Sequence, residues 1–137
     1  MTNGPQDVDN KVVFAEALWS LPLFANLALQ QLIPRFRHFD YFDLIASRIG
    51  KMIDPLRPGR LVVNLPPRHG KSFLLIAAIA FYLGRYPERE VMLVCHSQSL
   101  ARDLAAKLHA LIGSEMFRGI FPKFKMRPGR ESTTDFR

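Results

Sequence analysis

Cysteine is almost absent from this chain, because Cys95 is the single example among 137 residues. One cysteine excludes an internal disulfide bond and a cysteine-based metal cluster, and it fits a reducing cytoplasm. Histidine is also scarce, and none of the four histidines is separated from another by a short metal-ligand spacing. The sequence therefore predicts no zinc site.

Acidic residues are few relative to basic ones. The chain has 12 Asp and Glu against 19 Lys and Arg, which gives a net charge of +7. This excess favours polyanionic partners, although charge can also serve solubility alone. Hydrophobic residues make up 48% of the chain, so disorder throughout is excluded and at most one small domain is expected.

The chain also lacks an uninterrupted apolar run of membrane-spanning length. Residues 12–33 come closest, but polar side chains interrupt them, Pro22 lies near their middle, and the residues ahead are more acidic than basic. A membrane role is therefore not expected. We expect two short helices instead, at residues 11–20 and 23–32, with their apolar side chains packed on the body of the protein.

Residues 61–72, which read L-V-V-N-L-P-P-R-H-G-K-S, combine three local signals. Residues 61–63 read as a buried strand that ends at two prolines. Gly70, Lys71 and Ser72 follow, and residues 73–83 then form an apolar helical run. A strand, a tight loop and a helix N-terminus in this order are typical of a phosphate-binding site.

Each residue type in this loop suits a triphosphate. Gly70 lets the backbone approach phosphate oxygens closely, Lys71 supplies a cation to the β- and γ-phosphates, and Ser72 offers a hydroxyl ligand to Mg²⁺. The usual pattern G-x-x-x-x-G-K-S/T would place its first glycine where this chain has Leu65, so the strict pattern is not met.

A second strand and helix are predicted downstream. Residues 91–95 are apolar without alternation, which is typical of an internal strand parallel to the first. A helix with a leucine stripe follows from Ser97 or Ser99 and ends at Gly113. Strand, helix, strand and helix in turn predict an α/β fold with a parallel sheet.

The run P-P-R-H-G-K-S, with N-L before it, resembles the variant Walker A loop of the large terminase subunits of tailed bacteriophages, the ATPases that pump DNA into the procapsid. Those proteins often lack the first glycine. Residues 38–41 (H-F-D-Y), 95–101 (C-H-S-Q-S-L-A) and 120–122 (I-F-P) also resemble family segments. The resemblance covers residues 35–137, is specific in the loop and is loose elsewhere.

The resemblance implies a P-loop NTPase-type parallel sheet with flanking helices, incomplete at the C-terminus. Residues 1–34 would be an N-terminal helical segment, and residues 35–137 a partial ATPase domain. The implied cofactors are ATP and Mg²⁺, and the implied partners are double-stranded DNA, the small terminase subunit, the portal protein and further copies in the full-length motor. Residues implied to contact the ATP phosphates are Pro67, Arg68, His69, Gly70, Lys71 and Ser72; Lys71 and Arg68 would be catalytic, and Ser72 would bind Mg²⁺.

Three further groups of residues have a functional and a structural interpretation. Phe39 and Tyr41 could stack on adenine, or they could simply belong to the core. Ser97, Gln98 and Ser99 could contact nucleic-acid phosphates, while a serine there could also cap a helix. The basic residues Lys123, Lys125 and Arg127 could follow a DNA backbone, or they could be solvated only.

No apolar strand downstream of Ser72 is followed by paired acidic residues, so a Walker B motif is missing. We therefore expect a first part of a longer terminase subunit, in the host cytoplasm, with its enzymatic activity in isolation left open. One alternative is a non-catalytic prophage remnant or nucleic-acid-binding module. Another is a small P-loop kinase, although the loop is not the usual one for that class.

Overall fold

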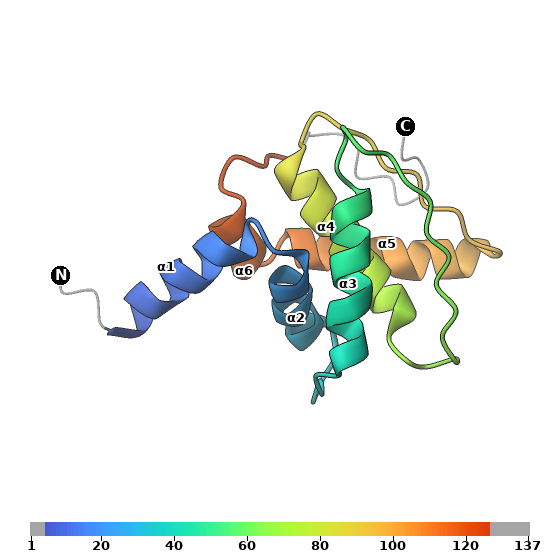
Figure 1. Cartoon of the computed structure of the whole chain (residues 1–137), viewed down its shortest axis with the longest axis horizontal. Helices are drawn as coiled ribbons and strands as arrows, with labels where there is room; N and C mark the ends of the chain where they lie inside the picture. Colours follow the sequence, from blue (N-terminus) through green and yellow to red (C-terminus); the bar gives the residue numbers. More distant parts are fainter. Residues whose placement is uncertain (1–4, 127–137) are drawn as a thin grey trace.

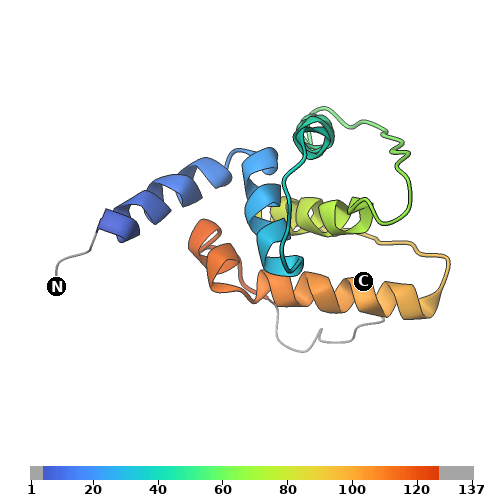
Figure 2. The ribbon, with the colours of Figure 1, turned by 90° about the horizontal axis from the view of Figure 1, so that it is seen from below.

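The computed structural model describes residues 5–126, which form six α-helices around one hydrophobic core. Figure 1 shows the first helix reaching outward on one side, and two long helix-free connections on the opposite side. Figure 2 gives the same arrangement from below. The helices are α1 (Pro5–Ala17), α2 (Leu21–Leu32), α3 (Asp40–Met52), α4 (Lys71–Arg85), α5 (Gln98–Ile112) and α6 (Glu115–Ile120).

The predicted α/β class with a parallel sheet is wrong, because residues 5–126 contain no strand. Residues 61–63 and 91–95, predicted as strands, are extended, but no main-chain hydrogen bond joins either stretch to another described segment. Both stretches line one hollow over α4 and do not pair with each other. An extended segment becomes a strand only when a neighbour completes its ladder.

The two predicted N-terminal helices are present, with α1 starting and ending earlier than expected. Ser20 separates them and caps α2, because its Oγ accepts a hydrogen bond from the backbone N–H of Leu23 at 3.4 Å. Pro22 lies in the first turn of α2, where its missing N–H costs nothing. No single helix among those described is long and apolar enough to cross a bilayer. Asp9–Ala17 and Leu21–Leu32 together have the required length and composition, but the chain bends by 117° between them.

Helix α4 is the centre of the fold and contacts α2, α3 and α5. It is apolar nearly all round, as the sequence predicts, and most of it is buried. Leu75 is an exception, with 43% of its surface exposed. The buried residues are Leu74, Ile76, Ala77, Ala78, Ile79, Ala80 and Phe81.

Phenylalanine rings join α4 to α2 and to the C-terminal part of the fold. Phe24 is fully buried, and its ring centroid lies 5.5 Å from that of Phe81, 6.2 Å from Phe117 and 5.6 Å from Phe121. Aromatic pairs in tilted or edge arrangements contribute about 0.5–1.5 kcal/mol beyond the area that they bury. The cluster joins α6, which the sequence did not predict, to α2 through Phe117, and its C-cap residue Phe121 to α4 through Phe81.

Two glycines inside helices allow a test of this packing. A Cβ on Gly84 would meet the ring of Phe121 at 2.6 Å, whereas a Cβ on Gly50 would meet Leu21 at an ordinary 3.5 Å. Gly50→Ala should therefore stabilise the protein by up to about 1 kcal/mol through helix propensity. Gly84→Ala should instead destabilise it by about 1–3 kcal/mol through overpacking. Urea unfolding followed by circular dichroism measures both, and equal effects of the same sign would contradict the packing described for Phe121.

Candidate functional site

The loop that leads into α4 has an unusual backbone. Arg68 and Gly70 both have positive φ, at 65° and 75°, so two of three consecutive residues adopt the left-handed backbone conformation. Glycine accepts this conformation readily, whereas for an arginine it costs about 1–2 kcal/mol. Strain of this kind persists only where the surrounding structure imposes it, and it is found frequently at ligand-binding sites.

The position of Gly70 is restricted by space as well as by conformation. A Cβ there would lie 2.7 Å from Cζ of Phe42, a buried residue in the first turn of α3. The loop therefore packs its backbone directly against this ring. Only glycine permits both the positive φ and this close approach.

The N-terminus of α4 is open. Gly70 is the N-cap, no side chain caps the helix, and Lys71 and Ser72, its first two residues, are exposed. Among the described residues, none accepts a hydrogen bond from the N–H groups of Lys71, Ser72 or Phe73. The first N–H group of the helix that donates is that of Leu74, to the carbonyl oxygen of Gly70 at 3.0 Å. Free N–H groups and the helix dipole together favour an anion at this end.

A hollow of about 510 Å³ lies beside this loop. The hydroxyl of Tyr41 donates a hydrogen bond to the carbonyl oxygen of His69 at 3.3 Å, which ties the start of α3 to the loop. The rings of Phe39 and Tyr41 are stacked, with centroids 5.5 Å apart and planes inclined by 19°. The lining residues are Ile33, Arg35, Phe36, Arg37, Phe39, Tyr41, Phe42, Arg68, His69 and Gly70.

The hollow thus brings together five residues that the sequence predicts from two separate segments, namely Phe39, Tyr41, Arg68, His69 and Gly70. Pro67, Lys71 and Ser72 belong to the same loop but do not line the hollow. Within the loop, Nδ1 of His69 donates to the carbonyl oxygen of Pro67 at 2.9 Å. This bond turns the His69 ring back onto its own loop.

Sequence reasoning missed Phe42 as part of the site. Its place in the apolar stripe of α3 indicates a core residue, and it is indeed buried, but it also supports Gly70 and lines the hollow. Its position next to Tyr41 is the signal that could have identified it. Arg35 and Arg37 also line the hollow and, together with Arg68, give it three guanidinium groups.

The predicted nucleic-acid residues lie elsewhere, and none of the described ones lines the hollow. Ser97 is the N-cap of α5 and accepts from the N–H of Leu100 at 3.3 Å, which confirms the capping interpretation. Gln98 and Ser99 are exposed at the start of α5, and Lys123 and Lys125 are exposed after α6. Arg127 lies outside the described residues. Contact of this group with DNA stays a prediction.

The fit to Mg²⁺ is limited to one hydroxyl. In residues 5–126 no group of three or more His, Cys, Asp or Glu side chains is placed to hold a metal ion. Ser72, at the exposed start of α4, could supply one oxygen ligand. Mg²⁺ in nucleotide sites takes much of its coordination from phosphate and water, so a single hydroxyl is compatible with it.

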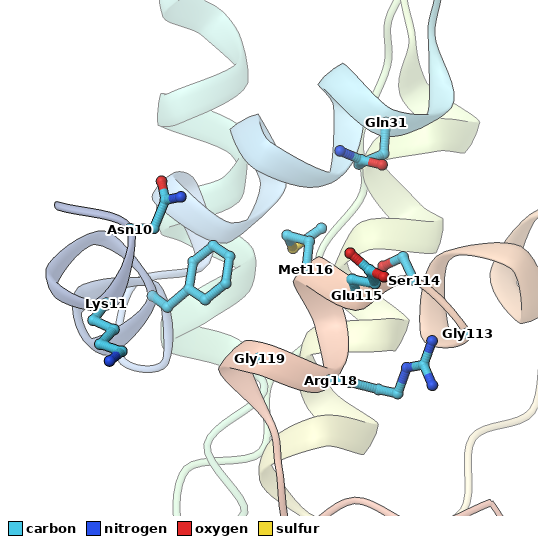
Figure 3. A pocket seen from close by; sticks show the side chains of 10 residues that line it. Asn10, Lys11, Gln31, Gly113, Ser114, Glu115, Met116, Arg118 and Gly119 are labelled. Atoms are coloured by element: carbon cyan, nitrogen blue, oxygen red, sulfur yellow. The ribbon is translucent and has the colours of Figure 1, made fainter. Parts of the chain in front are cut away.

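A second hollow, of about 880 Å³, lies between α1, α2 and α6 (Figure 3). Met116 and Gln31 border it, and Lys11 lies at its edge on α1. None of the residues that the sequence singles out for a site lines it, and the structure describes no buried polar or charged side chain. The loop before α4 is therefore the better candidate.

Comparison of the chain with protein-family models, with curated proteins and with solved structures finds no match. The terminase resemblance of the loop consequently rests on the sequence motif alone. The function of the site has to be inferred from its geometry and its residue types.

The contact between Gly70 and Phe42 can be tested by a double-mutant cycle. Gly70→Ala introduces strain of about 1–2 kcal/mol from the positive φ, together with an overpacking cost of about 1–3 kcal/mol against the ring. In a Phe42→Ala background the overpacking part should disappear, so that the same substitution costs only the strain. Free energies of unfolding in urea measure the difference. An equal cost in both backgrounds would show that Phe42 does not constrain the loop.

Proposed function

We propose that this chain binds ATP at the loop of residues 67–72, as the N-terminal part of a phage terminase large subunit that powers translocation of double-stranded DNA into a procapsid. One observation carries the proposal. Gly70, Lys71 and Ser72 form the uncapped start of α4, and the hydrogen bond from Tyr41 to His69 holds an aromatic pair beside them.

The phosphate part of the proposed site uses the N-terminus of α4. The free N–H groups of its first turn bind phosphate oxygens, and Lys71 adds a full positive charge at the same end. Arg68, which has a positive φ and lines the hollow, would supply its guanidinium to the γ-phosphate. The strain at Arg68 is then the cost of placing a guanidinium in the loop.

The base part uses the stacked rings. Phe39 is 48% exposed, so one face of the pair is available to a purine. Base stacking on an aromatic ring contributes about 1–3 kcal/mol in nucleic-acid-binding proteins. Because Tyr41 also donates to the carbonyl of His69, the same residue connects the base part with the phosphate part.

The proposal covers binding of ATP and leaves turnover by this chain alone open. Mg²⁺ would neutralise phosphate charge, with Ser72 as its ligand from this chain. After Ser72, no apolar stretch of this sequence is followed by paired acidic residues. The sequence therefore offers no recognisable carboxylate pair to hold Mg²⁺ and to orient the attacking water. In the full motor, in the host cytoplasm, the proposed partners are DNA, the small terminase subunit, the portal protein and further copies.

A non-catalytic nucleic-acid-binding module is the second candidate. The net charge of +7 and the three arginines around the hollow favour a polyanion of any kind. This candidate differs from the first in requiring no triphosphate. Binding of DNA with a steep salt dependence and without ATP binding would favour it.

Lys71→Ala should weaken binding of a fluorescent ATP analogue by at least about tenfold, because a charge-assisted contact to phosphate is lost. Lys51→Ala is the matched control, since Lys51 is an exposed lysine in the last turn of α3 and lies outside the loop. Titration followed by fluorescence anisotropy measures both affinities. An unchanged affinity in Lys71→Ala would remove the loop from the proposed function.

Variants of Tyr41 separate the two parts of the site. Tyr41→Ala removes the stacking ring and should weaken ATP binding by about tenfold, while binding of inorganic tripolyphosphate stays nearly unchanged. Tyr41→Phe keeps the ring and loses only the hydrogen bond to His69, so it should weaken ATP binding by a smaller factor, about two- to fivefold. Isothermal titration with each ligand gives the comparison. Equal losses for ATP and tripolyphosphate would place Tyr41 outside the base site.

A further inference from the structure

Two arginines of this chain have a backbone conformation that arginine rarely adopts. Arg35 and Arg68 are the non-glycine residues with positive φ in residues 5–126, at 58° and 65°. Each directly follows a proline, namely Pro34 and Pro67. The left-handed conformation is unfavourable for any residue with a Cβ atom, so both positions store strain.

The strain at Arg35 arises in a tight turn between α2 and α3. The backbone N–H of Phe36 donates to the carbonyl oxygen of Ile33 at 3.2 Å, with Pro34 and Arg35 as the two central residues. A proline followed by a residue with positive φ is the pattern of a type II turn, whose second central position favours glycine or asparagine. Phe36 anchors the turn, because its ring packs on the core with its centroid 5.8 Å from that of Phe42. A reason for an arginine at this position therefore has to lie in its side chain.

Both strained arginines line the same hollow, the one beside the loop before α4, and Arg37 lines it with them. Figure 1 shows the connection from α2 to α3 and the start of α4 near the same end of α3. Two connections that are far apart in the sequence thus each place an arginine at this hollow through a left-handed residue. The strain is associated with the hollow and with no other part of residues 5–126.

The hollow carries positive charge without a counter-charge from the protein. No Asp or Glu is among its lining residues. Arg35, Arg37 and Arg68 are exposed, and none of them forms an ion pair within the part of the chain that the structure describes. Three like charges around one hollow repel each other, and an anion bound among them removes that repulsion. A guanidinium group suits phosphate in particular, because it donates two parallel hydrogen bonds to it.

We propose that Arg35 is a phosphate-binding residue of the nucleotide site and that it binds the phosphate groups of ATP together with Arg68. This inference rests on the proposed function of the loop, to which it adds a residue from the connection between α2 and α3. Both guanidinium groups donate hydrogen bonds to phosphate oxygens, so the bound nucleotide joins that connection to the loop before α4. The phosphate contacts offset the strain at the two arginines.

Arg35→Gly tests this inference, because it removes the guanidinium and the strain together. Binding of ATP and of inorganic tripolyphosphate, measured by isothermal titration, should weaken by a similar factor of at least about tenfold. Thermal unfolding followed by circular dichroism should show a Tm raised by about 2–5 °C, because glycine is unstrained at this position. A side chain with a purely structural role would behave differently, since its loss lowers the Tm.

Arg60→Gly is the matched control, since Arg60 is exposed, does not line the hollow and has no positive φ. It makes the same change of charge and should leave both affinities within about twofold of the original, without raising the Tm. Equal losses of affinity in the two variants, a lowered Tm in Arg35→Gly, or a loss for ATP without a loss for tripolyphosphate would overturn the proposal.

The failure of this inference can be distinguished from the failure of the proposed function. If the original chain binds neither ATP nor tripolyphosphate, both are wrong. If it binds them, Lys71→Ala weakens the binding and Arg35→Gly leaves it unchanged, the loop keeps its proposed function and the role of Arg35 is overturned.

Discussion

The packing of α4 against three other helices is the contact on which the rest of the structure depends. The apolar surface of α4 demands cover on nearly every side, and α2, α3 and α5 supply it. The open N-terminus of α4 is the proposed anion site, and Leu75 and Ile79 of the same helix line the hollow bordered by Leu61, Val63, Val91 and Met92.

In the proposed function, α3 supplies the base-binding part of the anion site. Phe42 lies under Gly70, while Tyr41, one residue earlier, reaches the carbonyl of His69. Two adjacent side chains therefore fix the separation between the aromatic pair and the phosphate loop. A rigid separation of this kind favours one length of ligand over others, because a preorganised site loses less entropy when the ligand binds.

Sequence patterns identified most helices and the candidate loop, because those signals are local. The apolar run after Ser72, the serine cap at Ser97 and the order of Gly70 and Lys71 each depend on a few neighbouring residues. The sheet could not be judged in this way. Residues 61–63 and 91–95 have strand composition, but a ladder requires a neighbour that sequence composition does not supply. The contact of Phe42 with Gly70 could not be predicted for a related reason. The apolar periodicity of α3 places Phe42 in the core but does not say which loop packs on its ring.

The loop before α4 also has a covalent connection to the hollow over that helix. Leu61 and Val63 line this hollow, and Pro66 and Pro67, whose rings fix their φ angles, lead from the same stretch directly into the loop. Packing that orders residues 61–65 therefore also restricts the loop. A restricted loop loses less conformational entropy when it binds a ligand.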